Sequence, residues 1–275
     1  MGDILNIKNF NLYVGRYSGR PNAKPPEKEL GWYLNNAIHE RLPVLALRKR
    51  DAGDESPLSW TGGRNTRIAV NVTLDSLKAW QAFRSGRPGA GEKIINRLSQ
   101  ELPWAVVKFQ DKMTDCGVRL VREVPKLEWS GVDRVVIAMA DIVGKISFLK
   151  AKQAPMLGSK VMNFMLPEFF PVWDTAWVKS ALAAEDTSDE SLGDWFSAAA
   201  KKRLSKLPHA SPSVQYARYV ALMLKELYAT PTREYKAILA AYVRYSRVDR
   251  STIKWHFADL APILFEVCLL GKHNG

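Results

Sequence analysis

The spacing of apolar residues predicts α-helices along most of the chain. In the clearest case, apolar side chains recur at i, i+3, i+4 and i+7 over residues 132–149, with Ser130 as the predicted N-cap. This stripe consists of Val132, Val135, Val136, Met139, Ile142, Val143, Ile146 and Leu149. A second stripe, for which Ser213 is the predicted cap, consists of Ala217, Val220, Ala221, Leu224, Leu227 and Tyr228. Both patterns are typical of helices that bury one face.

Weaker patterns predict further helices, and glycine and proline residues divide them. Apolar residues recur every third position at Leu74, Leu77, Trp80 and Phe83, after a candidate cap at Thr73 and before the Gly-rich loop at 85–91. Residues 92–102 and 104–113 follow as two predicted helices that Pro103 separates. The remaining predicted helices cover residues 32–47, interrupted at Pro43, and residues 195–207, 232–247 and 252–270. The Gly-rich loop lacks the GK[ST] ending of a phosphate-binding loop.

Two short segments in the N-terminal half have a strand-like pattern. They are residues 11–14 and the alternating apolar residues Ile68, Val70 and Val72. We therefore expect a mostly α protein, a helical bundle with a possible minor β hairpin near its N-terminus. We interpret residues 1–275 as a single domain. It consists of an arm (1–30), a first helical part (31–125), a central stretch (126–184) and C-terminal helices (185–275).

The charge of the chain indicates a polyanionic partner. Lys and Arg outnumber Asp and Glu by 40 to 28, so the formal net charge is +12, and the sequence pI is about 9.7. An excess of this size is typical of nucleic-acid binding, although a solvated basic surface is the alternative explanation. The chain also has nine Trp residues, whose flat rings serve both hydrophobic cores and base stacking.

Cysteine and histidine usage excludes several other classes of protein. Cys116 and Cys268 are far apart and form neither a disulfide framework nor a zinc motif, and four cysteines for an iron–sulfur cluster are not present. No pair has metal-ligand spacing among His39, His209, His256 and His273. We therefore expect no metal and no cofactor. The start of the chain has no signal peptide and no apolar run is long enough to cross a membrane, which predicts a cytoplasmic protein without membrane contact.

One segment near the middle of the chain carries most of the chemical information. Gly158 is expected to turn the backbone, and Ser159 and Lys160 to open a short helix. The first N–H groups of a helix have no internal partners and can bind an anion such as a phosphate. After the helix, Pro171 constrains the chain shortly before Asp174. An acid on a short, rigid, aromatic-lined connection is a candidate catalytic group.

This segment resembles the helix-hairpin-helix DNA glycosylases, in which a glycine-containing hairpin and a lysine precede a helix and a Pro-Val-Asp-Thr run. The sequence Phe-Pro-Val-Trp-Asp-Thr-Ala-Trp-Val-Lys at 170–179 is similar to that run with one residue inserted, and the resemblance covers about residues 141–184. The chain departs from the family in two ways. Its hairpin has one glycine rather than two or more, and Lys160 and Asp174 are only 14 positions apart, about one helical turn closer than in the family.

The resemblance implies a role for each residue type in this segment. Asp174 would stabilise a positively charged sugar and activate water, and Lys160 would form a Schiff base with the sugar. The implied DNA contacts are Lys150, Lys152, Gly158, Ser159 and Lys179, and the implied base pocket consists of Phe170, Trp173 and Trp177. Simpler roles remain open at this point: Asp174 as a helix cap, Lys160 as a phosphate contact, Lys179 as the partner of a local acid, and the aromatic residues as core packing.

Three functional hypotheses follow. The first is a monomeric DNA glycosylase that flips a damaged or modified base out of double-stranded DNA and leaves an abasic site, in repair or in defence against phage with modified DNA. The second is a non-catalytic DNA-binding protein on the same scaffold. The third is a helical adaptor protein whose basic charge is incidental.

Overall fold

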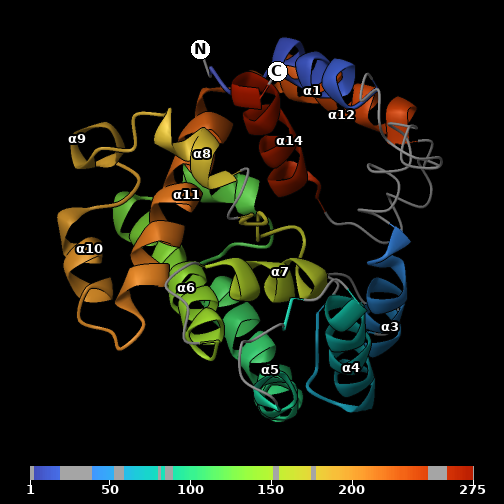
Figure 1. Ribbon diagram of the computed structural model, residues 1–275. Coiled ribbons are helices and arrows are strands. Elements are labelled where there is room, and N and C mark those ends of the chain that lie inside the picture. Colours follow the sequence, from blue (N-terminus) through green and yellow to red (C-terminus); the bar gives the residue numbers. More distant parts are fainter. Residues whose placement is uncertain are drawn as a thin grey trace.

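A computed structural model describes residues 3–18, 39–52, 59–79, 82–83, 89–150, 155–174, 178–246 and 259–274. The longer helices are α1 (Ile7–Ser18), α3 (Leu42–Ala52), α4 (Arg64–Ala79), α5 (Ala90–Asp115), α6 (Trp129–Phe148), α7 (Met156–Met165), α11 (Ala210–Ala229), α12 (Thr232–Ser246) and α14 (Ala261–Asn274). Short elements are the 3-10 helix η1 (Val121–Lys126), α8 (Val178–Ala183), α9 (Asp189–Leu192) and α10 (Ala198–Leu204). Within these ranges the protein is helical and has no strand, as Figure 1 shows.

Helix α6 lies at the centre, between α11 and α7 (Figure 1). Two glycines allow these close approaches. A Cβ added to Gly144 would lie 2.0 Å from Oγ of Ser213 on α11, and a Cβ added to Gly158 on α7 would lie 2.0 Å from the carbonyl oxygen of Val143. Contacts this short exclude any side chain, so both helix pairs depend on glycine at these positions.

The contact at Gly158 corrects the expected turn. Gly158 lies within the first turn of α7, which begins at Met156 after Pro155. Its N–H donates to Oγ of Ser147 at 2.9 Å. This glycine therefore serves helix packing rather than a backbone turn.

The two strand predictions are wrong. Residues 11–14 lie in α1, where Phe10 and Val14 are buried one helical turn apart while Leu12 is exposed. Ile68, Val70 and Val72 lie in α4, whose buried residues are Thr66, Ala69, Val70, Thr73, Leu74 and Leu77. In both segments the 3.6-residue period places the apolar side chains on one face better than alternation does.

The expected break at Pro103 is wrong as well, whereas the interruption expected at Pro43 is confirmed. Helix α5 continues through Pro103 because one buried stripe crosses it, formed by Ile94, Leu98, Leu102, Val106, Phe109 and Met113. Continued burial of this stripe offsets the backbone hydrogen bond that proline removes. Residues 40 and 41 form a turn, and α3 begins directly after it with Pro43 as its second residue, where a proline is tolerated.

The sequence predicted which segments are helical better than it predicted where each helix begins and ends. Helix α6 is capped by Glu128 rather than Ser130, and Ser213 lies inside α11 rather than at its cap. Helix α10 covers only part of the predicted helix 195–207, and α14 extends beyond residue 270. The first part of the predicted helix 32–47 lies outside the described residues.

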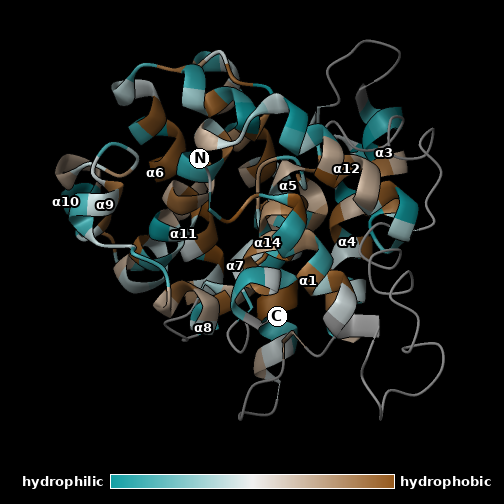
Figure 2. Cartoon of the chain, turned by 90° about the horizontal axis from the view of Figure 1, so that it is seen from above, coloured by the Kyte–Doolittle hydropathy of each residue, from teal (hydrophilic) through white to brown (hydrophobic). Residues whose placement is uncertain are grey.

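The apolar faces of these helices form one contiguous core, which includes residues from Ile4 near the start of the chain to Leu269 in α14. Figure 2 shows hydrophobic residues concentrated where α6, α7, α11 and α14 face one another. The terminal helices α1 and α14 pack side by side (Figure 1). Among the described helices, none has the length and apolar character needed to cross a membrane.

Candidate active site

The segment between α7 and α8 carries Asp174, and side chains from surrounding helices hold its backbone. Nδ2 of Asn163 donates to the carbonyl oxygen of Phe170 at 2.5 Å. The next two carbonyl oxygens accept hydrogen bonds from buried tyrosines of α11. The hydroxyl of Tyr216 donates to Pro171 at 2.8 Å, and that of Tyr219 donates to Val172 at 3.3 Å.

One N–H group of this segment is held in the same way. The N–H of Trp173 donates to Oγ of Ser159 on α7 at 2.9 Å. Side chains of α7 and α11 thus replace hydrogen bonds that a strand or helix would supply. The residues just before Asp174 are therefore fixed in place, as an active site requires.

Asp174 and Lys160 form a loose ion pair at the end of this segment. Nζ of Lys160 lies 3.9 Å from Oδ2 of Asp174, and 18% and 33% of the two side chains are exposed. Helix α7 is otherwise buried on nearly all sides, so Lys160 is a cation at the edge of the core. Lys160 and Asp174 are 14 positions apart in the sequence, and the structure places their side chains next to each other.

The carbonyl oxygen of Asp174 also starts helix α8. It accepts the N–H groups of Val178 at 3.0 Å and Lys179 at 3.2 Å. These bonds are to the backbone of Asp174, whereas the helix cap suggested by the sequence would use its side chain. The carboxylate of Asp174 lies 3.9 Å from Nζ of Lys160.

Glu266 is a second carboxyl group near the pair, and the sequence analysis did not select it. It keeps some accessible surface although its neighbours in α14, Phe265 and Val267, are only 0% and 6% exposed. Val172, Asp174 and Lys160 are among the groups that influence the pKa of Glu266, so it belongs to the surroundings of the pair. The available signal was a single acid in the apolar run 260–270.

Burial raises the pKa of Glu266 from its ordinary value to about 7. Arg41, the N–H of Val172 and Lys160 oppose this rise, whereas the charge of Asp174 adds to it. The phenols of Tyr216, Tyr219 and Tyr242 also lie within the electrostatic reach of Glu266. A carboxyl group with a pKa near neutrality can exchange a proton at physiological pH.

Arg41 supports the site from the residue before α3. It is 4% exposed, its Nε donates to Oδ1 of Asn163 at 2.7 Å, and its guanidinium lies 4.9 Å from the ring centre of Phe164. Burial lowers the pKa of Arg41, which the nearby charge of Glu266 partly offsets. Through Asn163, Arg41 is linked to the backbone of the segment that carries Asp174.

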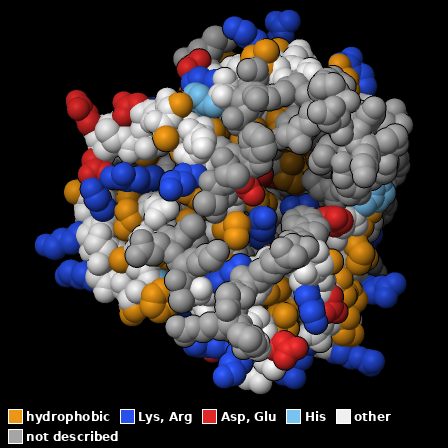
Figure 3. Space-filling model, viewed as in Figure 1, with side chains coloured by type: hydrophobic (Ala, Val, Ile, Leu, Met, Phe, Trp, Pro, Cys, Tyr) orange, Lys and Arg blue, Asp and Glu red, His pale blue; other side chains and the backbone are white. Residues whose placement is uncertain are grey.

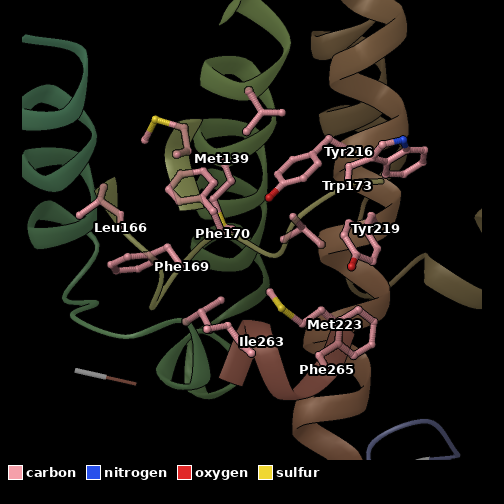
Figure 4. Close-up of a cluster of buried hydrophobic side chains, with 14 of the residues drawn as sticks. Met139, Leu166, Phe169, Phe170, Trp173, Tyr216, Tyr219, Met223, Ile263 and Phe265 are labelled. Carbon is pink, nitrogen blue, oxygen red and sulfur yellow. The ribbon is translucent and has the colours of Figure 1, made fainter. Parts of the chain in front are cut away.

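The predicted base-pocket residues Phe170 and Trp173 are core residues instead. Phe170 has no accessible surface and lies 4.8 Å, centre to centre, from the ring of Phe109. Trp173 is 4% exposed and packs edge-on against Tyr219 at 5.6 Å. Figure 4 shows these rings within one hydrophobic cluster. Trp177, the third predicted pocket residue, lies outside the described residues.

The predicted DNA contacts divide into buried and exposed residues. Ser159 is buried, and its hydroxyl joins the carbonyl oxygen of Met156 to the N–H of Trp173. Gly158 is buried against α6. Neither residue is therefore placed for contact with DNA. Nζ of Lys150 donates to the carbonyl oxygen of Ala82, so one of its donors already serves the fold.

Lys179 is exposed on α8 directly after the site, and Lys152 lies outside the described residues. Figure 3 shows Lys and Arg side chains projecting from several parts of the visible face. A hollow of about 680 Å³ lies between α5 and α6, bordered by Trp104, Lys108 and Lys145, and its lining includes neither Lys160 nor Asp174. Asp174 and Lys160 therefore do not line this hollow.

Across the part of the chain that the structure describes, no cluster of three or more His, Cys, Asp or Glu side chains is placed to hold a metal ion. Comparisons of the chain with protein-family models, with curated proteins and with solved structures find no match. The site geometry is therefore the main basis for a functional proposal.

Proposed function

We propose that this protein is a DNA glycosylase that cleaves the bond between a modified or damaged base and its sugar, with Asp174 as the catalytic carboxylate. The main support is the way Asp174 is presented. Side chains of Asn163, Ser159, Tyr216 and Tyr219 fix the preceding backbone, yet the Asp174 side chain is 33% exposed. A preorganised but accessible carboxylate is what stabilisation of a positively charged sugar requires.

In the proposed reaction, the bond between C1′ and the base nitrogen breaks and its electron pair leaves with the base. The sugar gains positive charge, which the carboxylate of Asp174 stabilises. A water molecule then adds to C1′ and loses a proton to a nearby carboxylate. The product is an abasic site. The target base is flipped out of the duplex before this step, because stacked bases are inaccessible.

Lys160 has two possible roles in this reaction. As an ammonium 3.9 Å from Asp174, it orients the carboxylate and contacts a DNA phosphate. As a neutral amine, it attacks C1′ and adds a lyase step. The ion-pair geometry supports the first role, so we propose a glycosylase without lyase activity.

The net charge of +12 supports DNA as the partner. Lys179 on α8 and Lys160 on α7 flank Asp174 in the chain segment that forms the site, and both keep exposed surface. We propose that they contact phosphates on either side of the flipped nucleotide. A monomer in the cytoplasm, acting in repair or in phage defence, fits this proposal.

The direct test is abasic-site formation. Wild type and Asp174→Asn are incubated with genomic DNA and with DNA rich in modified bases, and abasic sites are detected with an aldehyde-reactive probe. We expect sites from the wild type and a loss of at least about 100-fold in the variant. Borohydride trapping tests for the Schiff base, and an adduct that requires Lys160 would add the lyase step. Glycosylase chemistry is refuted if the wild type forms no sites on this panel.

One observation favours a second candidate, a DNA-binding protein without chemistry. The N–H of Gly158 is bonded to Ser147, so it does not offer a phosphate site at the start of α7. In this case DNA binding would fall with rising salt concentration, but no abasic sites would form.

A further inference from the structure

The hollow of about 680 Å³ between α5 and α6 is separate from the residues around Asp174, and its floor is apolar. The floor consists of Leu98, Leu102 and Ala105 from α5 and of Ile142, Ile146 and Leu149 from α6. On each helix these residues are spaced by three and four positions, which places their side chains on one face. A hollow of this size with an apolar floor is typical of sites that bind small organic molecules.

Trp104 forms one wall of this hollow, and it is 54% exposed. A Cβ added to Gly62 would lie 3.3 Å from Cζ3 of Trp104, so the indole ring rests against the backbone of Gly62. Gly62 has a φ of +79°, and its N–H donates to Oγ1 of Thr66 at 3.0 Å. One edge of the ring is therefore held in place, while the exposed part offers a flat apolar surface to a ligand.

The rim of the hollow carries more positive than negative charge. Arg97 and Glu101 form an ion pair at 2.8 Å, so their charges offset each other. Lys108 on α5 and Lys145 on α6 also line the hollow, and both are exposed. Within the described ranges, neither of these two lysines forms an ion pair. Two uncompensated cations beside an apolar floor complement a ligand that has an anionic head and an apolar body.

We propose that this hollow binds a long-chain carboxylate, with the carboxylate between Lys108 and Lys145 and the hydrocarbon chain on the apolar floor beside Trp104. The side chains of the floor have no hydrogen-bonding group, so a nucleobase would leave its polar edge without partners there, whereas a hydrocarbon chain would not. This binding site goes beyond the proposed glycosylase reaction and does not depend on it, since neither Asp174 nor Lys160 lines the hollow.

The test measures the binding of octanoate, decanoate and dodecanoate to the full chain by isothermal titration calorimetry, below the concentrations at which these acids form micelles. We expect a saturable complex of one ligand with one protein chain. Because each CH₂ group that leaves water adds hydrophobic free energy, the affinity should rise about threefold for each added CH₂. Decyltrimethylammonium has the same hydrocarbon chain with the opposite charge, so it should bind at least about tenfold more weakly than decanoate.

A pair of double variants locates the carboxylate. Lys108→Gln combined with Lys145→Gln removes both cations of the rim, so the affinity for decanoate should fall about tenfold. Lys78→Gln combined with Lys93→Gln is the matched control, because it removes the same charge from exposed positions of α4 and α5 that do not line the hollow. The affinity of this control should stay within about twofold of the wild type, since distant surface charges are screened by salt.

Two further variants locate the hydrocarbon chain. Ala105→Phe adds a ring at a half-buried lining residue without removing any core side chain, so it should fill the hollow and abolish binding. Decanoate brominated at its terminal carbon quenches tryptophan fluorescence on contact. Trp104→Phe should therefore keep the binding and remove most of the quenching. Thermal denaturation verifies that each variant is folded.

Three outcomes would overturn the proposal. Binding that both Ala105→Phe and the double variant of the rim leave unchanged would show nonspecific adsorption. Equal affinity for decanoate and decyltrimethylammonium would refute the role of the two lysines. No saturable binding up to about 1 mM would exclude the ligand class, and a wild-type dimer in sedimentation analysis that Ala105→Phe dissociates would assign the hollow to a second copy of the chain. None of these outcomes bears on abasic-site formation, so the two proposals are tested separately.

Discussion

Two pairs of a carboxylate and a cation lie at opposite ends of the segment between α7 and α8. They differ in burial, in distance and in the type of cation. Glu168 and Arg48 are 1% and 4% exposed and form a two-fold contact, with hydrogen bonds of 3.0 and 2.5 Å. Asp174 and Lys160 are 33% and 18% exposed and lie 3.9 Å apart. Only six positions separate the two acids.

The difference follows from the chemistry of the two cations. The planar guanidinium of Arg48 matches the two oxygens of Glu168 and occupies both, which suits a buried structural link. The ammonium of Lys160 is a point charge at a longer distance, so it orients Asp174 without occupying all of its lone pairs. The first pair is buried and holds the segment, whereas the second leaves 33% of its acid side chain exposed.

The largest expected effect is on the buried pair. Glu168→Ala leaves the Arg48 guanidinium buried without its carboxylate, which should lower the free energy of unfolding by about 3–5 kcal/mol. Urea denaturation measures this change. As the control, Glu101→Ala removes an exposed pair with Arg97 and should leave the urea midpoint unchanged. Equal effects of the two substitutions would show that burial does not distinguish the pairs.

Substitution in the exposed pair of Asp174 and Lys160 should change the cleavage rate and leave the stability nearly unchanged. Asp174→Asn keeps the shape of the side chain but removes its charge, so we expect cleavage to fall by about 100–1000-fold while the urea midpoint is nearly unchanged. Rates of abasic-site formation and urea curves on the same protein preparation test both parts. A large loss of stability would place Asp174 with Glu168 among the structural acids.

The pH dependence of stability tests Glu266. Its pKa is raised from 4.5 to about 7 in the folded protein, so the folded state binds the proton more tightly. Its contribution is therefore full below the unfolded pKa and is lost as pH rises through the folded value, a loss of about 3 kcal/mol. Urea unfolding between about pH 4.5 and pH 8 should show this decrease, and Glu266→Gln should remove that component. Stability that rises over this range in the wild type but not in the variant would contradict the assigned shift.

A smaller effect should follow from loosening the backbone next to Asp174. Ser159→Ala removes the acceptor of the Trp173 N–H, a buried group, at a cost of about 1–3 kcal/mol. We also expect a lower cleavage rate, because the backbone of Asp174 gains freedom. Ser99→Ala, an outer serine of α5 whose hydroxyl bonds only locally to the carbonyl oxygen of Asn96, is the control. Unchanged cleavage with reduced stability would limit Ser159 to a structural role.

The sequence predicted helices correctly where a long, regular spacing of apolar residues determines the structure. The stripe of α6 is long, and its buried residues agree with the 3.6-residue period. Helix α11 is predicted in part, because residues 219–224 are all buried and Tyr228 of the predicted stripe is 69% exposed. Short patterns failed where the burial of a longer stripe decided the outcome, as at Val70 in α4 and Pro103 in α5. Helix caps were missed because several polar residues near each start compete for the position.

The sequence singled out only those residues of the candidate site that lie near one another along the chain. Lys160 and Asp174 are near in sequence and meet through one helix and one connection. Glu266 lies 92 positions after Asp174, so no local pattern places it in the site. Gly158 and Ser159 were assigned to DNA because the sequence does not show that α6 packs against the start of α7.

The smallest expected effect concerns Lys179, which is exposed on α8 a few residues after Asp174. If it contacts a phosphate, Lys179→Gln should weaken binding equally for all sequences and reduce the slope of log K against log salt by about 1. Lys93→Gln changes an exposed lysine of α5, a helix that Figure 1 shows apart from α8, and should leave the slope unchanged. Fluorescence anisotropy on a short duplex at several salt concentrations measures both. Equal slopes for the wild type and Lys179→Gln would mean that DNA does not pass over α8, and the exposed pair would then need a different approach path for its substrate.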